Sequence, residues 1–247
     1  MTHNVLDQHK EIERFLYICS HDIRKPLRTI ANFMQLLIEH NTEKFDETSS
    51  EYIQHILKRL TRIDTFIKNI QLYSFLSTQS KELCLVDMHH TLRIIHNHFM
   101  PHLEQAHAVI EIGNLPTLYA NPAHMLQLFM NLIDNAIKFR NENPLIIRIS
   151  AIDKHNMWEF SIADNGISID KEFKNTIFNF FTRLDTLSDY EGSDMRLSIC
   201  SKIVHMYQGT INVRPNKAGG CAVIVTFPKH EKQRIDSLSL NQTIEQP

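Results

Sequence analysis

The sequence predicts an α+β protein in which a helical hairpin precedes a separate, mixed α/β domain. In roughly the first third of the chain, apolar residues recur at alternating spacings of three and four, as they do along one face of an α-helix. From residue 83 onward, short segments with strand-like alternation are interleaved with helical segments. The polar stretch STQSKE at 77–82 separates the two patterns, so we expect a linker there.

The first long helix is predicted over residues 11–40. His21 falls off its apolar seam, so we expect the imidazole to face solvent. Pro26 has no N–H to donate to the carbonyl of Asp22, and the helix should therefore bend just after His21. The seam itself consists of Ile12, Phe15, Cys19, Ile23, Pro26, Ile30, Phe33 and Leu37.

The second helix is predicted over residues 51–75, after a polar break. The sequence Thr48-Ser49-Ser50-Glu51 has the form of a capping box that opens this helix. Its seam repeats the same spacing, through Ile53, Ile56, Leu60, Ile63, Ile67 and Ile70. One hairpin cannot bury both seams well, whereas two hairpins can pair into a four-helix bundle. We therefore expect a homodimer.

The rest of the chain reads as a second domain. An apolar helix is opened by Asn121-Pro122, and Gly209 is the expected stop of the last helix. Further helices are predicted over 88–105 and 198–207, and strands over 83–86, 109–112, 117–119, 145–151, 158–163, 210–213 and 222–227. The predicted domains are thus 1–76 and 83–228, followed by a frayed polar tail at 229–247.

The composition limits the partners and the location of the protein. A formal net charge of −2 gives no electrostatic argument for nucleic acid or for an anionic membrane. No apolar run reaches the roughly 18–20 residues that a membrane span needs. The four cysteines are dispersed, as is typical of a reducing compartment, and we expect a cytoplasmic protein. The histidine clusters do not match a zinc spacing with cysteines.

The octapeptide SHDIRKPL at 20–27 carries a candidate phosphoacceptor. It places an exposed His21 beside Asp22, Arg24 and Lys25, with Arg28 one position beyond the stretch. A lone exposed histidine would usually have no function, so the whole stretch carries the argument. It resembles the H-box of two-component sensor histidine kinases, and most closely that of the phytochrome-like branch.

Three polar residues lie on one face of the helix that follows Pro122. Asn131, Asn135 and Lys138 are spaced i, i+4 and i+7, and Phe139 comes next. Amide oxygens suit Mg²⁺, for which Asn135 is the candidate ligand, and an ammonium suits phosphate. The alternative is an ordinary amphipathic helix with polar residues facing water. Asparagine is unfavourable inside a helix, so two of them a turn apart favour the functional interpretation.

The sequence IADNGI at 162–167 places Asp164 at the end of a predicted strand, two residues before Gly166. The pattern is compatible with a simple turn. In combination with the other motifs it resembles the D-x-G-x-G box of GHKL ATPases. That resemblance implies that Asp164 accepts a hydrogen bond from the amino group of adenine.

The motifs occur in the order found in histidine kinases. Phe178, Phe180 and Phe181, with Arg183-Leu184, resemble the phenylalanine box that follows the first glycine box. The resemblance runs from about residue 11 to residue 227. It identifies the chain as a member of the histidine kinase family and implies a dimerisation and phosphotransfer domain followed by a GHKL (Bergerat-type) ATP-binding domain, an α/β sandwich.

The second glycine box departs from the family pattern. The family's G-T-G-I-G-L-A-I aligns with a stretch that keeps Gly192 but has Asp194 and Arg196 in place of two glycines. Ser168 replaces the second glycine of the first box. A side chain hinders the approach of backbone amides to phosphate, and Asp194 repels a triphosphate. We therefore expect binding of ATP and Mg²⁺ to be weak or absent. The less favoured alternative is that Arg196 supplies a replacement phosphate contact.

The resemblance implies a kinase that is phosphorylated on His21 and passes the phosphate to an aspartate of a response-regulator receiver domain. Asp22 is the candidate acid/base, and Lys25 is placed to compensate the phosphoryl charge. Two alternatives remain open: an ATP-independent dimeric phosphotransfer protein and a pseudokinase scaffold. The sequence begins about twenty residues before His21. Any input is therefore expected from a separate sensor protein or through the lead-in helix.

Overall fold

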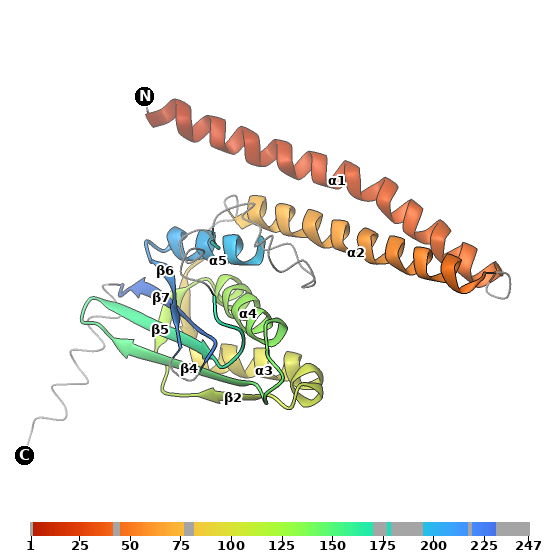
Figure 1. Ribbon diagram of the computed structural model, residues 1–247. Helices are drawn as coiled ribbons and strands as arrows, with labels where there is room; N and C mark the ends of the chain where they lie inside the picture. Colours follow the sequence, from red (N-terminus) through yellow and green to blue (C-terminus); the bar gives the residue numbers. More distant parts are fainter. Residues whose placement is uncertain are drawn as a thin grey trace, which may run out of the picture. The chain divides into compact units, whose positions relative to one another are not determined.

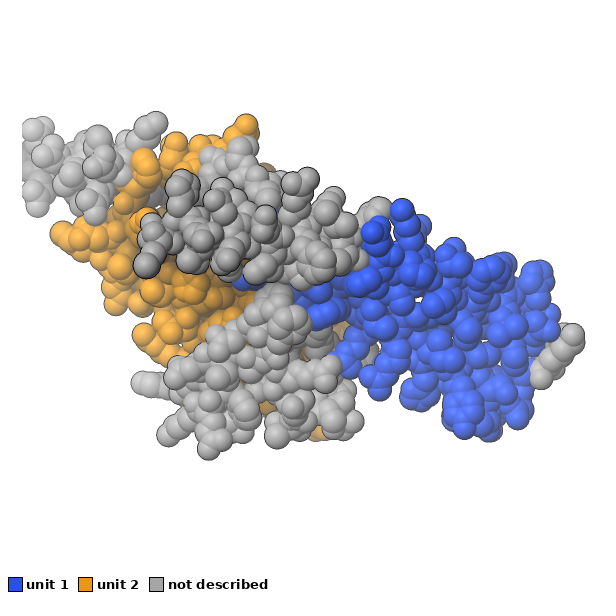
Figure 2. All heavy atoms as spheres, turned by 90° about the horizontal axis from the view of Figure 1, so that it is seen from above, with its two compact units in different colours: residues 1–79, 185–196 blue, residues 80–184, 197–247 orange. Residues whose placement is uncertain are grey.

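The computed structural model describes residues 2–41, 45–76, 82–169, 177–178, 195–216 and 219–230, apart from the side chains of residues 2–19 and 21. The chain divides into two compact units, residues 1–79 with 185–196 and residues 80–184 with 197–247 (Figure 2). Across the described ranges, no helix is both long enough and apolar enough to cross a lipid bilayer.

Within the described residues, the first unit contains a hairpin of two long helices, α1 (Thr2–Asn41) and α2 (Glu47–Leu76) (Figure 1). Both predicted helices are confirmed, and α1 begins closer to the N-terminus than the seam indicates. Pro26 lies inside α1, as predicted. The bend expected beside it stays a prediction.

Helix α2 begins differently from the predicted capping box. The Oδ1 of Asp46 accepts a hydrogen bond from the backbone N–H of Ser49 at 2.8 Å. Asp46 is therefore the N-cap residue, and Ser49 lies in the first turn of the helix. The capping box at 48–51 is wrong because an aspartate two residues upstream already supplies the capping oxygen.

Among the described side chains, the seam of α1 is largely open to solvent and the seam of α2 is partly open. On α1, the exposed fraction is 67% for Phe33 and 50% for Ile23, and on α2 it is 42% for Ile63. Ile53 and Ile67 are buried. Apolar side chains of this size, exposed in a row, favour burial against another surface. This pattern supports the predicted pairing of two hairpins, which stays a prediction.

In the described part of the second unit, five strands form a mixed sheet with the order β2-β4-β5-β7-β6. β2 and β4 are parallel, and the other neighbours are antiparallel. The strands are β2 (Val109–Ile112), β4 (Ile146–Asp153), β5 (Met157–Asp164), β6 (Ile211–Pro215) and β7 (Cys221–Pro228). A separate antiparallel pair is formed by β1 (Cys84–Asp87) and β3 (Thr117–Ala120).

The described part of this unit also contains the helices α3 (Met88–Gln105), α4 (Pro122–Lys138) and α5 (Met195–Met206), the last of which begins two residues before the unit's second segment, 197–247 (Figure 1). The alternation of β4 points Ile147 and Ile149 into the core and leaves Arg148 exposed. Phe129 of α4 packs edge-on against Phe160 of β5, with ring centroids 5.5 Å apart. Helices therefore cover one face of the sheet, and the predicted α/β sandwich is confirmed.

Helix α5 ends in a Schellman arrangement. The backbone N–H of Gly209 donates to the carbonyl of Val204, and that of Gln208 donates to His205. The residue with left-handed backbone is Gln208, at φ 58°, and not Gly209 as the prediction implies. Glycine is needed at 209 because a Cβ there would collide with the carbonyl oxygen of Thr226.

The predicted frayed tail does not begin at residue 229. The Lys229 ammonium lies 2.6 Å from the Oδ2 of Asp153 and 4.7 Å from the centre of the Trp158 ring. The ring of His230 lies against that of Tyr119, with centroids 4.5 Å apart. An ion pair and two aromatic contacts therefore hold both residues to the sheet and to β3. Residues 231–247 lie outside the described part of the chain.

Candidate functional site

Helix α4 carries the predicted asparagine motif, and its start is defined by a cap. The Oδ1 of Asn121 accepts hydrogen bonds from the N–H groups of Ala123 at 2.9 Å and His124 at 3.3 Å. Pro122 occupies the first turn, where its missing N–H costs nothing. The helix ends at Lys138, and the N–H of the following residue, Phe139, donates to the carbonyl of Asn135.

The three polar residues of this helix have different surroundings. Asn131 is buried, and its Oδ1 accepts a hydrogen bond from Gln127 Nε2 at 2.9 Å. Its Nδ2 is buried with no hydrogen-bond partner among the described residues, which leaves a donor for a ligand oxygen. Asn135 is partly exposed, and the Lys138 ammonium lies 4.8 Å from the Phe139 ring centre.

Asp164 ends strand β5 and is partly buried. Its Oδ1 accepts two backbone hydrogen bonds, from Gly166 N at 2.9 Å and from Cys221 N at 3.3 Å. Within the described ranges, Oδ2 receives no such bond and is available to a donor from a ligand. Burial raises the pKa of the Asp164 carboxyl, and the two backbone bonds oppose this rise.

The end of α4 and the loop after Asp164 meet. The N–H of Ile167 donates to the carbonyl of Phe139 at 2.9 Å. A Cβ at position 166 would collide with that same carbonyl, so Gly166 permits the close approach. The structure therefore brings four predicted site residues into one region: Lys138, Phe139, Asp164 and Gly166.

Ser168 fits the loop better than the sequence indicates. It is absent from the described non-glycine residues with positive φ, so glycine is not required at this position for its backbone. Its hydroxyl donates to the carbonyl of Gly220 at 3.0 Å. Sequence reasoning missed the turn that contains Gly220, because nothing in its local pattern points toward Asp164.

The second glycine box is described only in part. Arg196 lies in the first turn of α5, where helical backbone does not call for glycine. Phe178 is buried. The remaining motif residues, namely Phe180, Phe181, Arg183, Leu184, Gly192 and Asp194, lie outside the described residues.

The structure offers few metal ligands. Among the described residues, no group of three or more histidine, cysteine, aspartate or glutamate side chains is placed to hold a metal ion. A magnesium ion at Asn135 would therefore take most of its oxygen ligands from water and from a bound phosphate chain. The amide oxygen of Asn135 is compatible with such a shared site.

The predicted phosphoacceptor region lies in the middle of α1. The backbone of His21 is helical, but its side chain is outside the described ones. Asp22 and Lys25 are exposed. The sequence predicts that Arg24 adds positive charge to this turn, but in the structure its Nε lies 3.2 Å from the Oδ1 of Asp64 on α2. Sequence reasoning missed Asp64, which neutralises part of the cationic turn.

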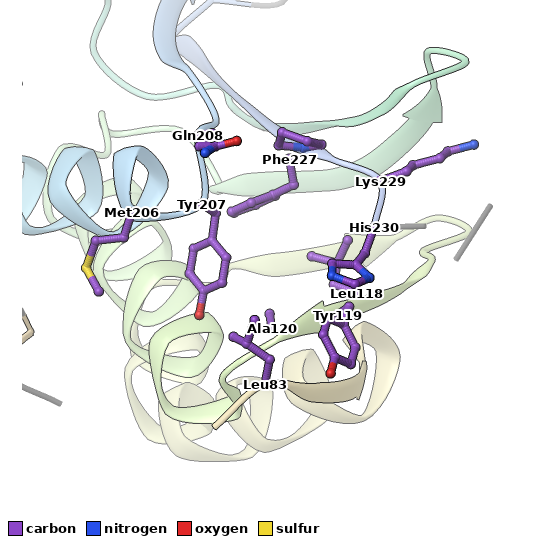
Figure 3. Close-up of a pocket in the computed structure, with 11 residues that line it drawn as sticks. Leu83, Leu118, Tyr119, Ala120, Met206, Tyr207, Gln208, Phe227, Lys229 and His230 are labelled. Atoms are coloured by element: carbon purple, nitrogen blue, oxygen red, sulfur yellow. The ribbon is translucent and has the colours of Figure 1, made fainter. Parts of the chain in front are cut away.

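A separate cavity of about 450 Å³ lies within the second unit (Figure 3). Tyr119 and His230 stand on one side of it, and Tyr207 and Phe227 on the other. None of the predicted site residues lines it. The Tyr207 hydroxyl accepts a hydrogen bond from Asn121 N at 2.9 Å and so touches the start of α4.

Comparison with known protein families finds matches in both units. Residues 11–79 match the His Kinase A (phospho-acceptor) domain. Residues 120–231 match the histidine kinase-, DNA gyrase B-, and HSP90-like ATPases. The first match contains His21, and the second contains Asn135 and Asp164.

Curated relatives include phytochromes and sensor kinases. The chain is 33% identical over 234 residues to cyanobacterial phytochrome A of Nostoc sp., covering 95% of this chain and 31% of that protein. It is 32% identical over 228 residues to the phytochrome-like protein Cph1 of Synechocystis sp., covering 92% and 30%. The chain thus spans about a third of the length of these relatives.

Solved structures share the fold. ShkA, crystallised full-length in complex with AMPPNP, aligns with a TM-score of 0.66 at 22% identity, over 88% of this chain and 46% of that chain. The Acinetobacter baumannii histidine kinase AdeS aligns with a TM-score of 0.59 at 20% identity, over 85% and 98%. At these identities the likeness concerns the fold alone.

Proposed function

Because this chain belongs to the two-component sensor histidine kinase family, we propose that it is an ATP-dependent autokinase phosphorylated on His21. The second unit binds ATP, and His21 of the first unit receives the γ-phosphoryl group. The phosphoryl group then passes to an aspartate of a response-regulator receiver domain.

The geometry of Asp164 carries this proposal. Two backbone N–H groups hold Oδ1, and Oδ2 is available on the same partly buried carboxylate. A carboxylate oxygen fixed in this way accepts a hydrogen bond from the amino group of adenine, which is a donor. ShkA, which shares this fold, was crystallised with an adenine nucleotide analogue, and this supports the choice of base.

The triphosphate is assigned to the polar face of α4. Asn131 offers the buried Nδ2 donor, and Lys138 offers an ammonium for phosphate oxygens. The Asn135 amide oxygen is the proposed protein ligand of Mg²⁺, which supplies charge neutralisation between the phosphates when bound. Gly192 and Arg196 are the proposed contacts from the second glycine box.

His21 acts as the nucleophile. A neutral imidazole has a nitrogen lone pair near pH 7, and in-line attack forms an N–P bond while the bond from the γ-phosphorus to the bridging oxygen of the ADP leaving group breaks. Asp22 is the proposed acceptor of the imidazole proton. Lys25, one helical turn beyond His21, compensates the negative charge of the phosphoryl group.

The wider assignments follow from the family. The exposed seams of α1 and α2 support a homodimer through a four-helix bundle. We place the protein in the cytoplasm, in a phosphorelay with a receiver domain. In the second glycine box, Asp194 and Arg196 stand in place of two glycines. This favours one further candidate, an ATP-independent phosphotransfer protein that receives its phosphoryl group from the receiver domain of another protein.

Radiolabelled transfer separates these possibilities. The unaltered protein, His21→Ala and the matched control His55→Ala, an exposed histidine of α2, are incubated with γ-labelled ATP and Mg²⁺. We expect acid-labile label on the unaltered protein and on His55→Ala, and none on His21→Ala. Label that comes only from a phosphorylated receiver would establish the phosphotransfer alternative. Label retained by His21→Ala would refute the phosphoacceptor assignment.

A further inference from the structure

The Asp164 carboxylate sits where two strands stop pairing. Strands β5 and β7 are paired as far as Ala163 and Ala222. One residue further, Cys221 N donates to the side chain of Asp164. The backbone carbonyl of Asp164 therefore lies beyond the last pair of this ladder and needs another donor.

That donor is the side chain of Asn216, which follows the end of β6. The Asn216 Nδ2 donates to the carbonyl oxygen of Asp164 at 2.8 Å. The backbone of Asn216 is fixed in turn, because its N–H donates to the Gly220 carbonyl and its own carbonyl accepts from Gly219 N, both at 3.2 Å. The contact is thus built from a closed turn and not from a loose surface side chain.

The turn lies directly against the Asp164 loop. Gly220 has a φ of 68°, and a Cβ on it would collide with Oδ1 and the carbonyl oxygen of Asp164. Two further bonds join the segments, from Ser168 Oγ to the Gly220 carbonyl at 3.0 Å and from Cys221 Sγ to the Ile167 carbonyl at 3.4 Å. Asn216, Gly220 and Cys221 therefore form one wall of the region around Asp164.

We propose that Asn216 is a positioning residue that fixes the direction of Asp164 Oδ2 and thereby sets the preference for adenine over a 6-oxo purine. This inference rests on the proposed function of Asp164. Without the Asn216 amide, the Asp164 carbonyl loses its side-chain donor and the peptide can rotate. The Oδ1 bonds to Gly166 and Cys221 then weaken, and Oδ2 no longer points consistently at the base.

The test compares two nucleotides that differ at position 6 of the purine, the group that Asp164 is proposed to bind. ATP carries a 6-amino donor, whereas ITP carries a 6-oxo acceptor. Dissociation constants for both, with Mg²⁺, are measured by calorimetry for the unaltered chain, Asn216→Ala and Asn216→Asp. Asn212→Ala is the matched control, since Asn212 is an exposed asparagine of β6. Hydrogen exchange of the Gly166 and Cys221 amides reports on the Oδ1 bonds without nucleotide.

For Asn216→Ala and Asn216→Asp we expect ATP to bind about three- to tenfold more weakly, which is the range of one net hydrogen bond. ITP binding should stay unchanged, and exchange of both amides should speed up. The inference is overturned if both nucleotides weaken equally or if exchange equals that of Asn212→Ala. If the proposed role of Asp164 in adenine recognition is wrong, the unaltered chain does not bind ATP more tightly than ITP. In that case, faster exchange of the Gly166 and Cys221 amides in Asn216→Ala still supports a positioning role for Asn216, and unchanged exchange refutes it.

Discussion

Arg24 of α1 and Asp64 of α2 form an ion pair across the hairpin, with 3.2 Å between Nε and Oδ1. The two side chains are 24% and 29% exposed, so the pair is partly shielded from water. It joins the turn that carries His21 to the second helix. Asp64 also pairs with Lys68, one turn further along α2, at 2.6 Å.

Removing Asp64 should therefore weaken the hairpin. We expect Asp64→Ala to lower the free energy of unfolding by about 1 kcal/mol, which corresponds to a fall in Tm of roughly 2–4 °C for a chain of this size. Lys68→Ala is the control, since the Lys68 side chain is 63% exposed and should matter little. Equal effects of the two variants in thermal unfolding would contradict the special role of the Arg24 pair.

Charging the seam of α2 should dissociate the predicted dimer. Leu60→Asp combined with Ile63→Asp places two carboxylates where a second hairpin is expected to pack, and each would be buried without a partner. We expect light scattering to give the dimer mass for the unaltered chain and the monomer mass for the double variant. Gln54→Asp, on an exposed position of α2, should stay dimeric. A monomeric unaltered chain at micromolar concentration would refute the prediction.

The sequence best predicts the helices and strands, because these depend on the spacing of apolar residues that are close together in the chain. Helix α3 is predicted over 88–105 and observed at Met88–Gln105, because its apolar residues follow the helical period. Asn131, Asn135 and Lys138 share a helix for the same reason. Strand alternation likewise predicts β4 and β5 to within two residues.

The residues whose contacts shape the site are distant from one another in the sequence, and no local sequence pattern predicts these contacts. The bond from Asn216 to Asp164 depends on where β6 and β5 end within one sheet. Ser168 counts as a lost glycine in the motif, but in the structure it supplies a hydrogen bond. The end of α5 shows the same limit, since Gln208 adopts the left-handed backbone while the adjacent glycine avoids a collision.

Replacing the Asp164 carboxylate should stabilise the fold at neutral pH while it removes base recognition. Burial raises the pKa of Asp164 above its ordinary value of 3.8, so ionisation opposes folding. The free energy of unfolding then falls as the pH rises from 3.8 through the folded pKa. Asp164→Asn avoids this loss and keeps an Oδ1 acceptor, but its Nδ2 faces the adenine amino group as a second donor.

We therefore expect Asp164→Asn to have a higher Tm at pH 7 than the unaltered chain, with the difference vanishing below pH 3.8, and to lose ATP binding. Asp153→Asn is the matched control with the opposite sign. The Lys229 partner lowers the pKa of Asp153, so its contribution to stability is present at neutral pH and is lost as the pH falls. A Tm of Asp164→Asn below that of the unaltered chain at pH 7 would contradict the argument.

Restoring glycines should have different effects in the two boxes. Ser168→Gly removes the hydrogen bond to Gly220 and adds backbone freedom, so we expect a loss of about 1–2 kcal/mol in stability and no gain in ATP affinity. In the second glycine box, Asp194→Gly removes a negative charge and leaves Arg196, the proposed phosphate contact, in place, so we expect tighter ATP binding. Calorimetry on the separate variants checks both statements. Tight binding of Mg²⁺-ATP by the unaltered chain would show that Asp194 and Arg196 do not weaken nucleotide binding.

The Tyr207 hydroxyl joins the ends of two helices of the second unit. It lies 2.9 Å from Asn121 N, at the cap of α4, and 2.9 Å from the Nδ1 of His124, which is 2% exposed. Tyr207 itself directly follows α5. Since the hydroxyl oxygen accepts from Asn121, its own hydrogen is available to the imidazole nitrogen.

Tyr207→Phe should therefore cost about 1–3 kcal/mol, because it leaves polar groups of Asn121 and His124 without this partner. Hydrogen exchange should increase in the first turn of α4 more than in its last turn. Adding His124→Phe should recover part of the loss, since replacing both partners with apolar groups removes an unmet hydrogen bond. Tyr52→Phe, at a position 65% exposed on α2, is the control in the same denaturant titrations. If Tyr207→Phe were as stable as Tyr52→Phe, the hydroxyl would not connect the two helices energetically.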